Sequence, residues 1–187
     1  KKADLLLLVA HPDDESDAAG GTIHKLIKEG NNVAIAIMSS QVKARSNLSE
    51  TLLEDEKEAM NILGVKTVYH ANFPNIKMNT VPHLDLVQFI ESCINDFSAE
   101  AIITHHPADT NNDHVITSYA VQAACRYFQR KKVAYRLKLF MYMETPSATE
   151  WSLDSSSHRF TPNRFVEIGD EGLNVKIKAL QAYKGVM

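Results

Sequence analysis

The chain has 187 residues, of which 44% are hydrophobic and 23% charged, the composition of an ordinary globular domain. A formal net charge of -3 argues against a nucleic-acid partner, and no apolar run approaches the roughly 18 residues that a membrane helix needs. Cys93 and Cys125 both fall within helical patterns, and we expect no signal peptide before Lys1. We therefore expect a cytoplasmic protein with reduced thiols.

The first predicted element is a strand over residues 5–10, where six apolar residues follow one another. Such a run is typical of a strand buried on both faces of a parallel sheet. The chain then turns through His11, Pro12, Asp13, Asp14 and Glu15 at the carboxyl end of this strand, the edge where open α/β sheets bind ligands. His11 and Asp14 are close enough in the sequence of this turn to bind one divalent ion, with Asp13 between them. Taken alone, the acids could equally serve only to favour the start of the next helix.

Further along the chain, the predicted elements alternate. Apolar spacing predicts helices over 18–28, 50–63, 83–97, 115–130 and 172–183, and strands over 33–38, 66–70, 101–103, 137–143 and 165–168. In the helices, Leu53 and Leu84 are expected to face inward, and Gly20 and Gly21 to allow close packing on the sheet. Successive strand-then-helix units predict an α/β fold, a three-layer Rossmann-like, parallel-rich sheet with helices on both faces.

A second polar cluster, from Thr104 to His114, follows the predicted strand over 101–103. Two strands that end in loops rich in histidine and aspartate would bring both loops to one edge of the sheet, so His114 is a natural third ligand beside His11 and Asp14. Three protein ligands with one open position are typical of catalytic zinc. Imidazole and carboxylate together suit Zn²⁺, or another first-row divalent metal, better than calcium or magnesium.

These two segments, the AHPDDE run from Ala10 to Glu15 and the pair Asp113 and His114, resemble the motifs of the PIG-L/LmbE-like zinc-dependent N-acetylglucosamine deacetylases. Shorter matches, such as Phe73-Pro74 and Thr80-Val81-Pro82, extend the likeness over nearly the whole chain. The resemblance implies a single LmbE-like deacetylase domain over residues 1–187 that lacks part of its C-terminus.

The resemblance also implies roles for individual residues. His11, Asp14 and His114 would bind zinc, Asp13 would be the general base that activates a zinc-bound water, and Asp113 would orient or support the site. Asp109, like Asp113, would hold a histidine ligand in the correct tautomer, or would only shape its loop.

The chain departs from the family pattern in two places. Asn111 stands where many relatives have a histidine, and an amide can donate a hydrogen bond but cannot act as an acid at neutral pH. Either Asn111 is the oxyanion donor, or His106 or His105 has taken that role. In the segment 73–79, Asn75, Lys77 and their neighbours replace two carboxylates of the family pattern, which puts the substrate in question.

We therefore expect a metal-dependent hydrolase that removes an acetyl group from the amide nitrogen of a small-molecule N-acetylated sugar or sugar conjugate. Arg45, Asn75, Lys77 and Trp151 would contact the substrate, and the serine-rich run 152–157 would form a loop over the pocket mouth. For Arg45 and its neighbour Lys43 the alternative is a solvated loop.

Other functions stay open. One is a catalytically impaired, metal-binding member of the same fold that acts as a sugar-binding protein. Another is a metal phosphoesterase, which would need a second metal about 3.5 to 4 Å from the first. The sequence does not fix the oligomeric state, and a homo-oligomer is compatible with it.

Overall fold

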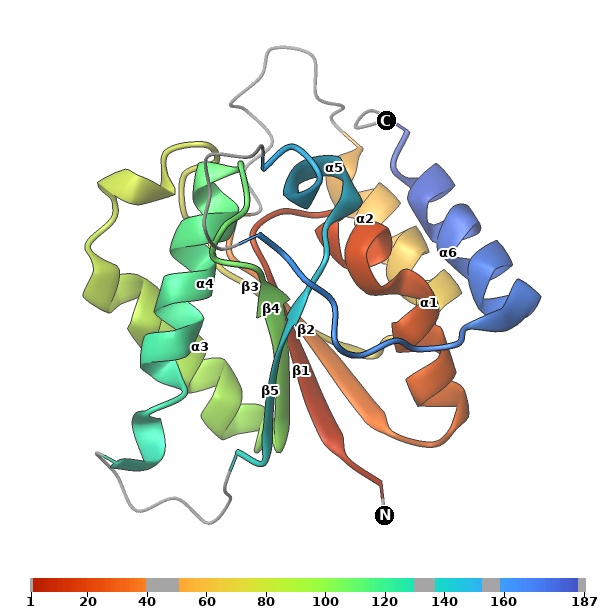
Figure 1. Ribbon diagram of the computed structural model, residues 1–187, viewed down its shortest axis with the longest axis horizontal. Helices are drawn as coiled ribbons and strands as arrows, with labels where there is room; N and C mark the ends of the chain where they lie inside the picture. Colours follow the sequence, from red (N-terminus) through yellow and green to blue (C-terminus); the bar gives the residue numbers. More distant parts are fainter. Residues whose placement is uncertain (1, 40–50, 130–136, 153–158, 185–187) are drawn as a thin grey trace.

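The computed structural model describes residues 2–39, 51–129, 137–152 and 159–184. Within them a five-stranded, entirely parallel sheet has the strand order β3-β2-β1-β4-β5 (Figure 1). Its strands are β1 (Asp4–Val9), β2 (Asn32–Ile37), β3 (Thr67–His70), β4 (Ala101–His105) and β5 (Leu139–Met143). The predicted α/β fold with a parallel sheet is confirmed.

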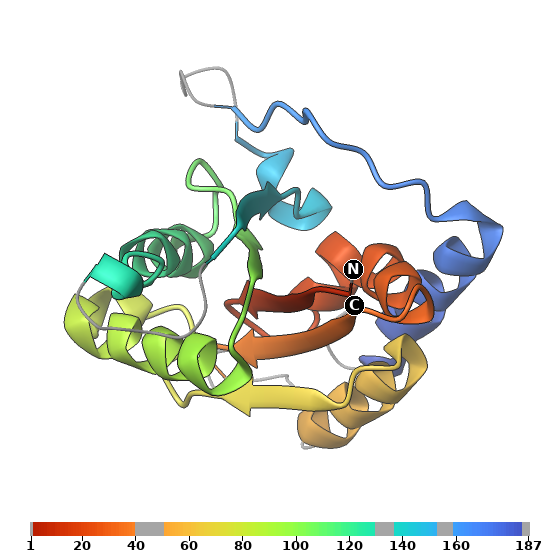
Figure 2. The same cartoon turned by 90° about the horizontal axis from the view of Figure 1, so that it is seen from below.

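Helices cover both faces of this sheet (Figure 2). The α-helices are α1 (Asp14–Lys28), α2 (Leu52–Leu63), α3 (His83–Phe97), α4 (Asn112–Ala124), α5 (Pro146–Thr149) and α6 (Gly169–Ala182). α3 and α4 pack together on one face, whereas α1, α2 and α6 lie on the other, where α6 contacts both α1 and α2. None of the described helices is both long and apolar enough to cross a lipid bilayer.

The central strand β1 explains the layered core. Its side chains alternate: Leu5, Leu7 and Val9 pack in the core that includes α1, α2 and α6, while Leu6 and Leu8 pack in the core beneath α3 and α4. Because both faces are covered, every position from Leu5 to Val9 must be apolar, as the sequence indicated.

The strand order also positions the loops that carry the polar residues. From β1 the chain proceeds to β2 and β3 on one side and returns to β4 on the other, so β1 and β4 are neighbours. Leu5 is paired with Ala101 and Leu8 with Thr104, which brings the loops after both strands to the same edge. This is the topological switch point, where open α/β sheets bind their ligands.

Several local predictions were wrong. Leu53 and Leu84 are 54% and 61% exposed, because Leu52 and Leu86 occupy the core-facing positions of α2 and α3 instead. No strand forms over 165–168, where Phe165 is 82% exposed and the chain runs without regular structure towards α6. The predicted helix over 115–130 ends as α4 at Ala124 and is followed by a short 3₁₀ turn, Tyr127–Gln129.

The pair Gly20 and Gly21 faces α6 rather than the sheet. A Cβ atom on Gly21 would lie 2.5 Å from Cδ1 of Ile168 and 3.2 Å from the carbonyl oxygen of Gly172. At Gly20 the nearest atom would be Cγ of Lys176, at 3.3 Å. The missing side chains therefore allow α1 and α6 to approach closely, a contact between elements that are distant in sequence.

Candidate metal centre

The loops after β1 and β4 bring three of the predicted residues together. The donor atoms of His11, Asp14 and His114 all lie within 4.8 Å of one another. Nε2 of His114 is 3.2 Å from Oδ1 of Asp14, and Nδ1 of His11 is 3.5 Å from Oδ2 of the same carboxylate. Asp14 and His114 are buried and His11 is partly buried. Their role as metal ligands stays a prediction, which this proximity supports.

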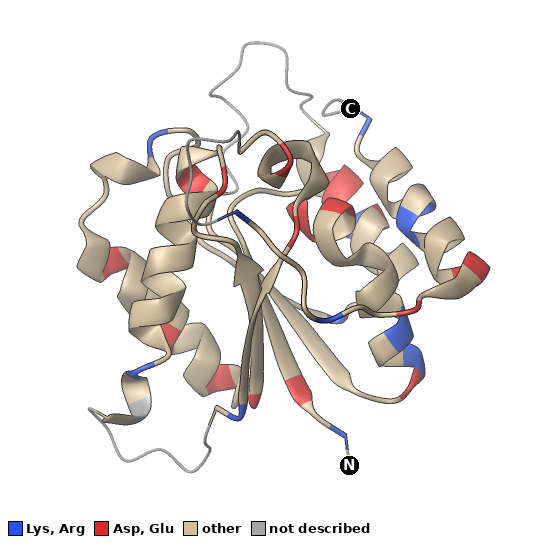
Figure 3. Ribbon diagram, in the orientation of Figure 1, with Lys and Arg blue, Asp and Glu red and all other residues tan. Residues whose placement is uncertain are grey.

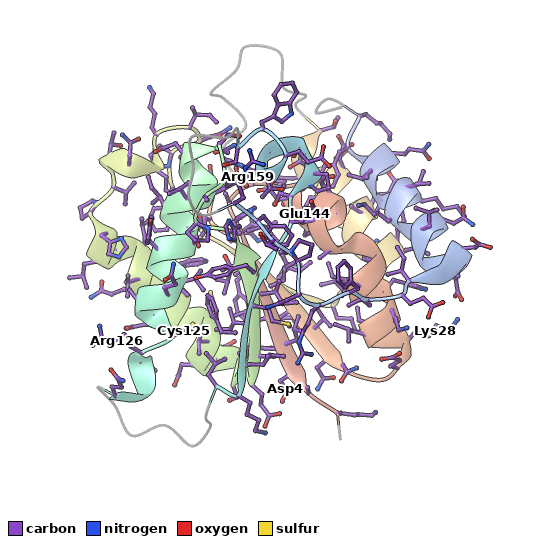
Figure 4. The ribbon with its side chains drawn as sticks, viewed as in Figure 1. Asp4, Lys28, Cys125, Arg126, Glu144 and Arg159 are labelled. Carbon is purple, nitrogen blue, oxygen red and sulfur yellow. The ribbon has the colours of Figure 1, made fainter. Side chains whose placement is uncertain are left out.

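Acidic residues, Asp14 of the cluster among them, follow one another in the first turn of α1 (Figure 3). Figure 4 shows Glu144, which directly follows β5, at the same end of the sheet, whereas Asp4, which begins β1, lies at the opposite end. The candidate centre is therefore confined to the carboxyl edge of the strands.

Each of the two histidines has a carboxylate at the ring nitrogen that is turned away from Asp14. Nε2 of His11 is 3.1 Å from Oδ2 of Asp113, and Nδ1 of His114 is 3.0 Å from Oδ2 of Asp109. Metal-binding histidines usually have such a partner, because it fixes the ring and raises the basicity of the other nitrogen. The positions of Asp109 and Asp113 agree with the supporting role expected for them.

The two supporting carboxylates are themselves held by backbone amides. Asp113 accepts hydrogen bonds from the N–H groups of Ile76 and Met78, at 2.7 and 3.1 Å, and Asp109 accepts one from Asn111 at 2.8 Å. The segment around Ile76 is thereby attached to the start of α4.

The electrostatics of the cluster favour a cation. Burial alone would raise the pKa of Asp14, but the charge of His114 and a hydrogen bond from His11 hold it well below its usual range. Burial lowers the pKa values of His11 and His114, yet their carboxylate partners outweigh it and raise them to about 9 and about 10. Positive charge is thus stabilised between Asp14 and the two rings, and a divalent ion would supply it in place of two protons. Two imidazoles and one carboxylate are a donor set that fits a first-row divalent metal.

Asp13 borders the centre in an unusual backbone conformation, with φ 100° and ψ -33°. For a residue with a side chain such a conformation costs about 1–3 kcal/mol, and it persists only where the surroundings impose it. Burial, together with the charges of Asp14 and Glu15, raises the pKa of Asp13 to about 8. Its carboxylate has no hydrogen-bond partner in the described part of the chain, so it could accept a proton from a reacting group.

His105 is buried between these groups as a neutral ring. Its Nε2 accepts the backbone N–H of Ala10 at 3.0 Å, which leaves the proton on Nδ1, 3.2 Å from Oγ1 of Thr145. Burial and the charge of His114 lower its pKa. The ring stacks on His114, with centroids 3.9 Å apart. Both nitrogens are engaged, so His105 has no N–H left to offer to a substrate.

His105, Asp109 and His114 also lie close enough to hold an ion. However, this second group shares His114 with the first. Asp109 is hydrogen-bonded to Nδ1 of that His114, and both nitrogens of His105 are taken up by Ala10 and Thr145. We interpret it as the support of one metal centre. The described residues thus give no separate second ligand set of the kind that a two-metal phosphoesterase needs.

Besides His105, the two other residues considered for the oxyanion, Asn111 and His106, lie in different surroundings. Asn111 caps α4, because its Oδ1 accepts the backbone N–H of Asp113 at 2.9 Å. His106 lies edge-on to Tyr142 and Phe160, with ring centroids 5.5 and 5.4 Å apart. It lines a cavity of about 340 Å³ beside β5, formed by residues 139–142 and 160–164. None of the three candidate ligands lines that cavity.

The predicted substrate-binding residues do not gather in one place. Asn75 lies beside Ile76, which is attached to Asp113, and its Oδ1 is buried without a hydrogen-bond partner among the described residues. Lys77 is exposed and Trp151 is 68% exposed. Arg45 and Lys43 lie outside the described residues, as does most of the run 152–157. Of the predicted substrate-binding residues that the structure describes, Asn75 and Lys77 thus flank Ile76, which is attached to Asp113, whereas Trp151 has no such connection to the centre.

Sequence reasoning assigned no role to Glu15 or to Tyr183, both of which are fully buried. Oε1 of Glu15 accepts the hydroxyl of Tyr183 at 2.8 Å, and Oε2 accepts the backbone N–H of Asp13 at 3.1 Å. The only signal in the sequence was a third consecutive acid after His11 and Pro12, and nothing pointed to a partner 168 residues away.

Comparisons with known proteins agree with this geometry. A family model described as "PIG-L: GlcNAc-PI de-N-acetylase" matches residues 6–125. The uncharacterized deacetylase YaiS of Escherichia coli (strain K12) is 25% identical over 189 residues, covering 98% of this chain and 92% of its own.

The fold is shared by solved structures, among them a deacetylase and a hydratase. The N,N'-diacetylchitobiose deacetylase of Pyrococcus horikoshii superposes with a TM-score of 0.78 at 19% identity, covering 99% of this chain and 71% of its own. The 4-carboxy-2-hydroxymuconate hydratase GalB of Pseudomonas putida KT2440 has the same TM-score and identity, covering 100% of this chain and 80% of its own. These likenesses concern the fold alone, and they show that it carries more than one chemistry.

Proposed function

Because the chain belongs to the PIG-L family, GlcNAc-PI de-N-acetylase, we propose that it is a metal-dependent N-deacetylase that acts on an N-acetylated sugar or sugar conjugate. The observation that carries the proposal is the cluster of His11, Asp14 and His114 with Asp13 beside it. The metal we expect is Zn²⁺, although the donor atoms would also suit another first-row divalent ion.

In the proposed mechanism, His11, Asp14 and His114 hold the metal. An ion bound there would act as a Lewis acid on the amide carbonyl and lower the pKa of a water ligand. Asp13 takes a proton from the attacking water and later delivers it to the departing amine. Asp109 and Asp113 keep the two imidazoles oriented through the hydrogen bonds described above.

Asn111 is the residue we propose as a donor to the oxyanion. Its amide oxygen is occupied by the cap of α4, so the NH₂ group, on the other side of the amide, can donate to a substrate. One such donor contributes on the order of 3 kcal/mol to the stabilisation of a tetrahedral oxyanion. His105 lacks a free N–H for this purpose.

The first test is acetate release from N-acetylglucosamine and N,N'-diacetylchitobiose by the zinc-loaded protein. We expect Asp13→Asn to keep its zinc and to lower the rate by about 10²–10⁴-fold, because only the proton acceptor is removed. Asp17→Asn is the matched control, because this acid lies in the same turn of α1 but bonds the backbone of Ser147 instead. It should retain the wild-type rate.

The second candidate is a metal-binding, sugar-binding protein with impaired catalysis. The observation that favours it is Asn111 at a position where the family pattern has a histidine that can exchange protons. The same experiment separates the two functions. Zinc binding and sugar binding by the wild type without acetate release from either compound would contradict the deacetylase and leave this second function.

A further inference from the structure

The conformation of Asp13 is imposed by hydrogen bonds on both sides of the residue. Its N–H donates to Oε2 of Glu15 at 3.1 Å, and its carbonyl accepts the N–H groups of Ser16 and Asp17 at 3.0 and 2.9 Å. The last two bonds belong to the first turn of α1 and would form in any helix. The bond to Glu15 is different, because it depends on where one side chain is held.

Glu15 is held by two hydroxyl groups. Its Oε1 accepts hydrogen bonds from Oγ of Ser16 at 2.7 Å and from the Tyr183 hydroxyl at 2.8 Å. Glu15 is 0% exposed and Tyr183 is 1% exposed, so water does not compete for these bonds. Tyr183 directly follows α6, which packs on α1 and α2. The end of α6 is thereby connected to the backbone of Asp13 through one buried carboxylate.

We propose that Glu15 and Tyr183 are positioning residues for the general base: Tyr183 fixes the Glu15 carboxylate, which fixes the backbone of Asp13 in its left-handed conformation. This inference rests on the proposed function of Asp13 as the proton acceptor. The described side-chain hydrogen bonds of Glu15 and Tyr183 go to Asp13, to Ser16 and to each other, and none goes to His11, Asp14 or His114.

This arrangement separates catalysis from metal binding. Removing the Tyr183 hydroxyl leaves Glu15 with Ser16 as its one hydroxyl donor, so the acceptor of the Asp13 N–H is held less firmly. Asp13 can then relax towards negative φ, which moves its carboxylate away from the position set by the structure. The three candidate metal ligands keep their own hydrogen bonds.

The test is Tyr183→Phe, which keeps the ring in place and removes only the hydroxyl. In the zinc-loaded protein, with N,N'-diacetylchitobiose as the probe, we expect kcat to fall by about tenfold to a hundredfold. A displacement of the catalytic base by about 1 Å lowers the reaction rate by a factor of this order. If the substitution acts only on the position of Asp13, KM from the same assay should stay within about twofold of wild type. The zinc dissociation constant, measured by calorimetry, should also stay within about twofold.

The matched control is Tyr69→Phe, which removes another tyrosine–carboxylate hydrogen bond, from Tyr69 to Asp96 at 2.6 Å. It joins β3 to α3 and should leave kcat unchanged. Glu15→Gln, alone and combined with Tyr183→Phe, tests whether the two residues act in one chain. Because Tyr183 acts through Glu15, the double variant should lose less than the product of the two single losses.

Two results in solution would overturn the inference: a kcat of Tyr183→Phe equal to that of wild type, or a loss of zinc affinity that accounts for its lower rate. A crystal structure of Tyr183→Phe provides a readout that does not need turnover. An unchanged φ and side-chain position of Asp13 would contradict the inference even if wild type releases no acetate. Wild type that binds zinc but is inactive would instead count against the proposed function.

Discussion

At the scale of single residues, the candidate centre depends on the ring nitrogens that do not face Asp14. His114 bonds Asp109 through Nδ1, which directs Nε2 to Asp14, and His11 bonds Asp113 through Nε2, which directs Nδ1 there. The orientation of each ring is thus fixed by an acid from the segment that runs from the loop after β4 into the first turn of α4. We therefore expect the two acids to determine how well the two rings can bind an ion together.

We expect Asp109→Asn to weaken zinc binding by about 10–100-fold, since loss of such a carboxylate partner typically has this effect on a metal-binding histidine. Calorimetric titration of the metal-free protein with zinc measures it. Asp85→Asn, an exposed acid in the first turn of α3, is the control and should bind zinc as wild type does. Unchanged affinity in Asp109→Asn would show that the orientation of His114 is set by its stacking on His105 rather than by the carboxylate.

Sequence reasoning at this scale depended on residue types. Histidine and aspartate after two apolar runs indicated which side chains would meet, because parallel strands end at one edge. The geometry brings His11, Asp14 and His114 together, and their function stays a prediction. Glu15 and Tyr183 were missed because their contact spans the chain. The placement of His106 beside β5 depends on aromatic contacts that no local pattern encodes.

At the scale of elements, apolar spacing was informative wherever one element is buried against the sheet. β1 was recognised because both of its faces are covered, and α3 was predicted with its observed bounds. The spacing failed at 165–168, because Phe165 and Val166 have the composition of a strand but no neighbouring strand among the described residues. Pairing partners are a property of the whole sheet, and a short apolar run does not reveal them.

The contact between α1 and α6 gives a prediction at this scale. We expect Gly21→Ala to lower the free energy of unfolding by about 1 kcal/mol, because overpacking costs about 1–3 kcal/mol and the better helix propensity of alanine returns up to about 1 kcal/mol. The added atom would meet Ile168 and the backbone of Gly172. Urea unfolding measures the change.

Gly20→Ala is the matched control, because Gly20 precedes Gly21 in the same helix. The added Cβ atom would meet only the side chain and Cα of Lys176, at 3.3 Å and beyond. It should be neutral or slightly stabilising. If the two variants unfolded at the same urea concentration, the close approach of α6 to Gly21 would not limit stability.

At the scale of the whole molecule, the candidate centre joins two halves of the sheet. His11 and Asp14 belong to the segment after β1, while His114 lies in α4, and β2, β3 and α3 separate them along the chain. An ion held by all three residues would bind only when both segments are in place, because the unfolded chain does not present this site. Binding to the folded state alone stabilises it by mass action.

Removing the metal should therefore lower the melting temperature. With free zinc at about 100 times its dissociation constant, the expected stabilisation is about 2.7 kcal/mol, which for a domain of this size corresponds to about 5–11 °C. Differential scanning calorimetry of the zinc-loaded protein with and without a chelator measures the difference. His114→Ala should melt at the same temperature in both conditions, because only two ligands remain. The prediction would be contradicted if the chelator removed stoichiometric zinc without changing the melting temperature of wild type. The zinc would then be bound at a site that does not depend on the fold, and not between the two converging loops.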